Sequence, residues 1–335
     1  MTQIRHQTSR INRRTWIAGA AAPCIAGLSQ ATGALATEPA VAGTIAAPIT
    51  SIIFSPDGSK VLAGSQAGVS IRDAVTLKEF RHLSVPMDNV HDLRFTPDGS
   101  LLAIAGGNPG EQGVVQLIDW PSANVRQQIL HHDDVVDGVD FCPLSKRLVT
   151  ASSDEVCAVF EIGSSKPNAR FTAHSKAVRS VRFLPSGESI VSASRDETLR
   201  VWQASAGEAI RTMHNHSRDV NALALRPDES AAMPMIASAS ADLTIRFWQP
   251  TIGRMVRFAR VPSEPLSIQW SATADALIAG CADGTVRHID PVGVKVLGQQ
   301  NLSTCWLHAL AVDPKIAGHI VAGTADGKIV AATGM

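Results

Sequence analysis

The sequence predicts an all-β protein in which about seven similar units pack around a common axis. Three observations carry this prediction. A short apolar-then-Pro motif recurs every 41 to 46 residues, each unit holds short segments with apolar residues at alternate positions, and no clear helical period follows residue 36. One four-stranded sheet cannot cover both of its own faces, so the units are expected to pack on one another.

The repeat is clearest in the turn that closes the first apolar segment of each unit. Phe54–Gly58 (FSPDG) returns as Phe95–Gly99 (FTPDG), and Phe183–Gly187 (FLPSG) keeps its Pro and Gly. Proline sets φ at the second position of a tight turn, and glycine tolerates the positive φ that follows. The key apolar residues of the series are Phe54, Phe95, Phe141, Phe183, Leu225, Trp270 and Val312.

The fourth unit shows how each repeat is expected to fold. Its first strand contains Val178, Val181 and Phe183, and a second follows at 189–194. After a turn at 195–197, strands are expected at 198–202 and 209–213. About 299 residues after position 36 allow seven units of about 43 residues each.

The third, fourth and fifth units also repeat a set of polar and aromatic residues. Asp follows Ser or Thr by four residues, and an aromatic residue follows Asp by six. A single enzyme site needs one nucleophile, so copies in neighbouring units indicate a structural role and not a Ser-His-Asp catalytic triad. The three sets are His132, Thr150, Asp154 and Phe160; His174, Ser192, Asp196 and Trp202; and His216, Ser238, Asp242 and Trp248.

These residues resemble the His–Ser/Thr–Asp–Trp network of WD40 repeats. The resemblance implies a seven-bladed β-propeller in which the Trp donates its indole N–H into a buried hydrogen-bond network. It also implies that residues 38–42 supply the outermost strand of the last blade and so close the ring. The chain departs from the pattern because the other four units lack the His and the Trp-Asp dipeptide is never complete.

Residues 1–36 are predicted to be an export signal, and 37–335 the propeller. The segment holds Arg5, Arg10, Arg13 and Arg14 with no acid, then an apolar run too short to span a bilayer and a small-residue site at 34–36. Arg13-Arg14 before Trp16-Ile17 resembles a twin-arginine signal. A periplasmic or extracellular bacterial protein without a membrane anchor is therefore expected.

Composition and motifs argue against several kinds of site. The chain has 30 basic and 30 acidic residues, and removing the four arginines of the leader leaves a net charge of −4, which disfavours binding to nucleic acid. No phosphate-binding Gly loop, metal-ligand set or cofactor motif is found, so no cofactor, metal or catalytic residue is expected. Cys281 and Cys305 remain open as either core thiols or an oxidised pair.

The resemblance to WD40 repeats also implies a binding face, because in that family the turns carrying the His and Asp face one end of the ring, which commonly serves for docking. Seven residues at the start of the innermost strands, six of them polar, are expected to surround the channel mouth: Thr50, His91, Asp137, Arg179, Asn221, Leu266 and His308. Ser153, Arg195 and Arg218 are expected beside them, and the loop 106–113 on the same side. Mixed charge around an opening suits a protein or peptide partner.

The predicted function is therefore that of a non-catalytic scaffold, a monomeric propeller within a complex. Because fold does not determine function, this prediction rests on the resemblance and on the lack of a catalytic set. The alternative is a propeller enzyme of the lactonase or hydrolase kind that uses the central channel. Acidic or His ligands converging on a metal in that channel would favour the alternative.

Overall fold

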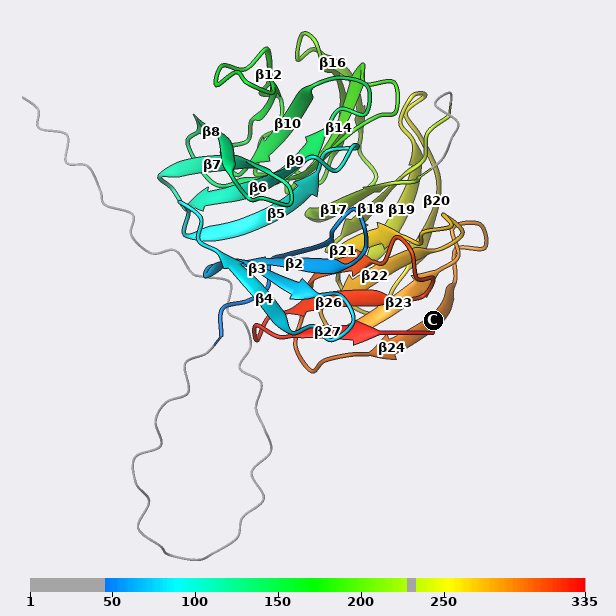
Figure 1. Ribbon diagram of the computed structural model, residues 1–335. Helices are drawn as coiled ribbons and strands as arrows, with labels where there is room; N and C mark the ends of the chain where they lie inside the picture. Colours follow the sequence, from blue (N-terminus) through cyan, green and yellow to red (C-terminus); the bar gives the residue numbers. More distant parts are fainter. Residues whose placement is uncertain (1–45, 228–232, 335) are drawn as a thin grey trace, which may run out of the picture. The chain divides into compact units, whose positions relative to one another are not determined.

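A computed structural model describes residues 46–227 and 233–334. This part of the chain is all-β and contains seven antiparallel sheets, or blades, arranged as a β-propeller (Figure 1). Each blade is a meander whose four strands follow one another outward from the axis, except the last, which has three described strands. No helix in the described ranges is long and apolar enough to cross a membrane.

The strands of the first four blades follow the predicted repeat closely. In the fourth blade the predicted segments 189–194 and 209–213 are strands with those same bounds. The strands are β1 (Ser51–Phe54), β2 (Lys60–Ser65), β3 (Gly68–Asp73) and β4 (Glu79–Leu83); β5 (Asn89–Phe95), β6 (Leu101–Asn108), β7 (Gln112–Asp119) and β8 (Val125–His132); β9 (Val136–Phe141), β10 (Arg147–Ser152), β11 (Cys157–Glu161) and β12 (Ala169–Phe171); β13 (Val178–Phe183), β14 (Ser189–Ser194), β15 (Leu199–Gln203) and β16 (Ala209–Met213).

The last three blades continue the same order. They comprise β17 (Val220–Leu225), β18 (Ile236–Ser240), β19 (Thr244–Gln249) and β20 (Arg254–Arg260); β21 (Pro265–Trp270), β22 (Leu277–Cys281), β23 (Thr285–Ile289) and β24 (Val296–Asn301); and β25 (Leu307–Val312), β26 (Ile320–Thr324) and β27 (Ile329–Ala332). The predicted closing strand, 38–42, lies outside the described residues.

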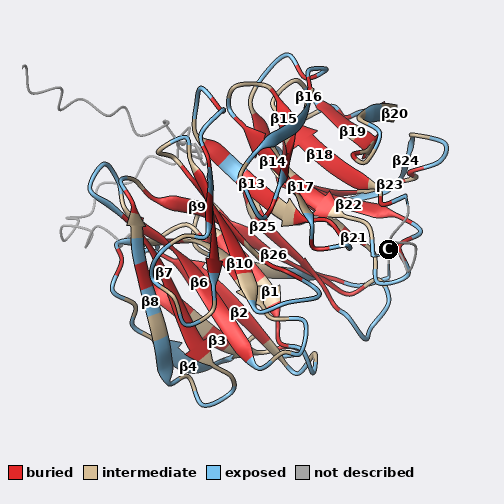
Figure 2. Cartoon of the chain, turned by 90° about the horizontal axis from the view of Figure 1, so that it is seen from above, coloured by how far each residue is buried: buried red, intermediate tan, exposed pale blue. Residues whose placement is uncertain are grey.

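The core lies between the blades. The described residues form seven apolar clusters, and each cluster joins two neighbouring blades. The middle strands of each blade are almost wholly buried, whereas outer strands such as β4 and β8 are largely exposed (Figure 2). This burial pattern is what sheets stacked face to face around an axis produce, because only the outer edge of each blade meets water.

The ring closes through the first and last blades. Ile49, Ile52 and Phe54 share one apolar cluster with Ala311 and Val321. The innermost strands β1 and β25 pack on each other as the other consecutive innermost strands do. The seven innermost strands therefore surround a central channel, with their free edges facing it.

Candidate protein-interaction face at the channel mouth

Three blades contain the predicted hydrogen-bond relay. In the fourth blade, His174 Nε2 lies 2.7 Å from Ser192 Oγ, and its Nδ1 lies 2.8 Å from Asp196 Oδ2. The ring is buried, so a partner on each nitrogen removes the cost of an unpaired polar atom. Equivalent contacts at the same distances join His132 to Thr150 and Asp154, and His216 to Ser238 and Asp242.

The fourth member of the relay differs between blades. Trp248 Nε1 donates to Ser238 Oγ at 2.8 Å, as the resemblance implies. The expectation is wrong for Trp202, whose indole nitrogen is buried without a hydrogen-bond partner. Its ring instead stacks on Phe171 of the preceding blade, with the ring centroids 5.2 Å apart and the planes 2° from parallel. Phe160 has no N–H to donate, and its ring meets His131 edge to face.

The relays hold the turns that surround the channel mouth. Asp196 accepts a hydrogen bond from the Thr198 backbone N–H at 3.0 Å, which fixes the turn carrying Arg195. Burial of Asp196 opposes ionisation, but the hydrogen bonds from His174 and Thr198 outweigh it, so the pKa of Asp196 lies well below its usual range. The relay is therefore a structural device that positions surface residues.

The sixth blade lacks the His and uses a different pair. Arg287 is 3% exposed and binds Asp283 through two hydrogen bonds of 3.0 and 2.5 Å. The equivalents of the relay His, Ser and Trp there are Val261, Ala279 and Ile289. Only the Asp of the relay is present in this blade, as Asp283, and its partner is Arg287 in place of a His.

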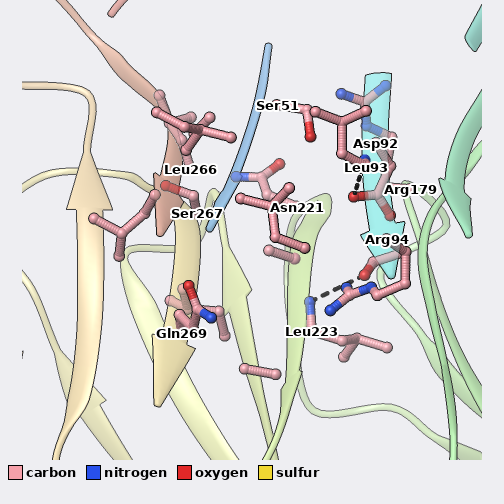
Figure 3. A pocket seen from close by; sticks show the side chains of 18 of the residues that line it. Ser51, Asp92, Leu93, Arg94, Arg179, Asn221, Leu223, Leu266, Ser267 and Gln269 are labelled. Carbon is pink, nitrogen blue, oxygen red and sulfur yellow. Dashed lines mark hydrogen bonds between the residues drawn. The ribbon is translucent and has the colours of Figure 1, made fainter. Parts of the chain in front are cut away.

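All seven residues predicted to surround the mouth line one cavity of about 650 Å³ in the central channel. Figure 3 shows Arg179, Asn221 and Leu266 among the side chains around it. Six lie near the start of an innermost strand and Thr50 directly precedes β1, so seven separate blades contribute one residue each. The ring members are Thr50, His91, Asp137, Arg179, Asn221, Leu266 and His308.

Asp137 is the centre of the hydrogen-bonding on one side of the mouth. Its Oδ1 accepts from Arg179 Nη1 at 2.5 Å, and its Oδ2 accepts from Ser153 Oγ at 2.6 Å. His91 Nδ1 lies 3.6 Å from Asp137 Oδ1. Burial lowers the pKa of His91, and this effect together with the charge of Arg179 outweighs the opposing influence of Asp137. Asp137 and Arg179 therefore act as one fixed pair.

Other predicted residues lie around this ring. Asn221 Nδ2 donates to Glu264 Oε1 at 2.8 Å, and Arg195 Nε donates to Asp219 Oδ2 at 2.6 Å. The predicted loop at 106–113 is the β6–β7 hairpin, and its Gly110 N–H donates to Asp134 at 2.9 Å. Ser153, Arg195 and Arg218 are not part of the cavity lining.

Trp306 is a surface residue that the sequence reasoning missed. Its side chain is 38% exposed and meets His308 edge to face, with the ring centroids 5.7 Å apart. Burial lowers the pKa of His308, and Arg179 lowers it further. Trp306 stands one residue before β25, two places from the ring member His308. Its position two residues before a predicted ring residue is the sequence feature from which Trp306 could have been predicted.

The cysteines and metal ligands form no further site in the described ranges. Cys281 is a buried free thiol, so it is not bridged to Cys305. Burial raises the pKa of the Cys281 thiol to about 11. In residues 46–227 and 233–334, no three His, Cys, Asp or Glu side chains come together as metal ligands.

Comparison with known proteins agrees with the repeat. Residues 165–203 and 207–249 match the family model for the WD40 repeat, described as WD domain, G-beta repeat. The chain is a seven-bladed β-propeller with WD40 repeats. The two matched segments end just after Trp202 and Trp248, in the two blades that carry all four relay residue types.

One curated relative is Protein HIR1 of Yarrowia lipolytica (strain CLIB 122 / E 150). It is 29% identical over 133 residues, which cover 33% of this chain. The matched part makes up 12% of that protein's own length. The likeness therefore covers only a small part of that relative.

Proposed function

We propose that this protein is an exported, non-catalytic scaffold that binds a protein or peptide partner through the channel-mouth face. We define this face as the seven ring residues together with Ser153, Arg195, Arg218 and Trp306. WD40 propellers typically serve as protein-interaction scaffolds. The observation that carries the proposal is that an exposed Trp stands beside a mixed-charge ring of polar residues.

The physical reason is the composition of protein interfaces. Trp and Arg dominate the residues that contribute most to binding, because they offer a large apolar area together with hydrogen-bond donors. Trp306 and Arg195 both meet this description, with side chains 38% and 53% exposed. The fixed pairs around them, such as Asp137 with Arg179, give the partner a rigid pattern of charge.

The test is capture of partners by the purified propeller from the exported fraction of its own cells. We expect Trp306→Ala and Arg195→Glu each to reduce the captured partner about tenfold or more. Arg211→Glu is the matched control, because Arg211 is an exposed arginine on β16, the outermost strand of the same blade as Arg195. Equal loss in all three variants, or no partner captured by the unaltered protein, would refute the proposed face.

Export is proposed from the leader, which lies outside the described residues. Arg13 and Arg14 stand where a twin-arginine signal places its pair. Replacing both with Lys keeps the charge and is expected to leave the protein inside the cell, whereas replacing Arg5 and Arg10 with Lys is expected to have little effect. Cell fractionation and the mass of the exported chain check this, and equal export of both double variants would contradict a twin-arginine route.

A further inference from the structure

The cavity has one charged wall and one apolar wall below the mouth. Arg94 and Arg182 stand three residues further along their strands than the ring members His91 and Arg179, which places them about 10 Å deeper. Asp92 and Asp140 lie on the same wall. The remaining wall comes from other blades; Ile53, Ala222, Ala224 and Leu310 make it largely apolar, and Ser267 and Gln269 add polar groups to it.

The acids of the charged wall already have structural partners. Asp92 accepts hydrogen bonds from the backbone N–H groups of Leu93 and of Val139 in the next blade, at 2.9 and 3.0 Å. Asp140 Oδ2 accepts from the Phe183 N–H at 2.8 Å. Val139 and Phe183 belong to the free edges of innermost strands, so these bonds satisfy backbone groups that no strand pairs. The two carboxylates are therefore fixed in orientation.

The arginines of the same wall are far less occupied. Arg94 Nε forms an ion pair with Asp140 Oδ1 at 3.6 Å, but it is buried and makes no hydrogen bond. Arg182 makes one hydrogen bond among the described residues, from Nη1 to the Val181 carbonyl at 2.6 Å. Each guanidinium has five N–H donors, so most of the ten point to no protein acceptor.

The two guanidinium groups also repel each other. Burial lowers the pKa of Arg182 to about 10, and the charge of Arg94 contributes to this shift. The wall thus carries two guanidinium groups with spare donors beside the carboxylates of Asp92 and Asp140. An anion between them would satisfy these donors and reduce the repulsion.

We propose that the cavity binds a small organic acid, with its carboxylate between Arg94 and Arg182 and its carbon skeleton against the apolar wall. A planar carboxylate suits the fork of donors that each guanidinium presents. A cavity of about 650 Å³ lies within the range of small-molecule sites. Asp92 and Asp140 favour a singly charged ligand over a doubly charged phosphate, because each added negative charge is repelled by both carboxylates.

This inference goes beyond the docking role of the mouth, and the two are tested separately. Isothermal titration of the purified propeller with hexanoate is expected to show saturable binding, and hexanamide, its neutral analogue, is expected to bind about tenfold more weakly or not at all. Acetate is expected to bind about tenfold more weakly than hexanoate, because it leaves the apolar wall uncovered.

Variants locate the site. Arg94→Gln and Arg182→Gln are each expected to weaken hexanoate binding about tenfold, whereas Arg126→Gln on β8, outside this cavity lining, leaves it unchanged. Should a Gln variant fail to fold, as judged by circular dichroism, the Lys variant keeps the charge but loses the fork, and weaker binding is again expected.

Four results would each overturn the proposal. The first three are no binding of hexanoate by the unaltered protein, equal binding of hexanamide, and unchanged affinity in folded Arg94 and Arg182 variants. Tighter binding of inorganic phosphate than of hexanoate would also overturn it, because contact between the carbon skeleton and the apolar wall would then add nothing to the affinity. None of these results bears on partner capture, which depends on Trp306 and Arg195 at the mouth.

Discussion

At the level of single residues, the tryptophan of the repeat makes different contacts in two neighbouring blades. Trp202 and Trp248 occupy equivalent positions and are both fully buried. Trp248 completes its relay through Ser238, while Trp202 stacks on Phe171 and leaves its indole N–H unpaired. The spacing of six residues after the Asp is identical, so the sequence offers no local sign of this difference. The packing of the adjacent blade decides it.

The two tryptophans provide a matched stability test. We expect Trp248→Phe to lower the free energy of unfolding by about 1 kcal/mol more than Trp202→Phe, because only Trp248 loses a hydrogen bond. Both changes remove similar buried ring area, so the loss of packing largely cancels in the comparison. Urea unfolding of the two variants measures the difference. Equal losses would show that the Trp248–Ser238 hydrogen bond makes no net contribution to the free energy of unfolding.

The relay aspartates predict a loss of stability in acid. Burial disfavours the ionised Asp242, but hydrogen bonds from Thr244 and His216 outweigh it and lower its pKa to about 2. The folded state therefore binds fewer protons than the unfolded state, and the stabilisation is present above about pH 4 and lost as pH falls towards 2.

Unfolding midpoints measured across this pH range check the effect. Asp242→Asn should be less stable than the unaltered protein at pH 6, and the gap should narrow as pH approaches 2. A gap that stays constant with pH would show that ionisation of Asp242 is not linked to folding.

At the scale of the blade, stability comes from different sets of residues in different blades. The fourth and fifth blades use His, Ser, Asp and Trp, whereas the sixth uses Arg287 and Asp283. The buried Cys281 thiol also contacts Arg287, so it packs beside the Arg287–Asp283 pair. The result is that a blade without the family's His still has a fixed turn at the mouth.

The arginine of the sixth blade supplies a test of this replacement. Arg287→Lys is expected to lower the free energy of unfolding by about 1–2 kcal/mol, because lysine cannot make both hydrogen bonds to Asp283. The loss is no larger because Asp283 is partly exposed and water can replace the missing bond. Arg257→Lys on β20 is the control, since Arg257 donates to the Val292 carbonyl at the exposed surface. A smaller loss for Arg287→Lys than for the control would contradict the structural role.

At the scale of the whole molecule, the ring depends on the contact between its first and last blades. Ile49 N–H donates to the Thr324 carbonyl at 3.1 Å, and Ala46 packs against the turn at Gly327. In the sixth blade the equivalent Gly284 faces Ser303, which follows the outer strand β24. Ala46 thus stands where a segment leaving the outer strand of the last blade would stand. This placement supports the proposal that residues 38–42 complete that blade.

Deletion tests the closure. Removing residues 38–42 from a chain that begins at residue 37 is expected to lower the midpoint of thermal unfolding, because the outer edge of β27 would lose its partner strand. Replacing the same five residues with Gly and Ser should have a similar effect if they form the proposed strand, because Gly and Ser disfavour an ordered strand relative to the unfolded chain. An unchanged midpoint in both variants would show that the ring closes through blade packing alone.

The repeat, the strand positions within it and the polar ring at the mouth could all be predicted from the amino-acid sequence. These features depend on local rules, namely turn chemistry at Pro and Gly, alternation along strands, and register counted from the His of each unit. Only the tertiary structure decided which donors in the channel have partners. Arg94 and Arg182 lie far apart in sequence, and the acids near them bind backbone groups of other blades. Hydrogen-bond satisfaction there depends on how the innermost strands of neighbouring blades pack against each other, and no spacing along the chain records that.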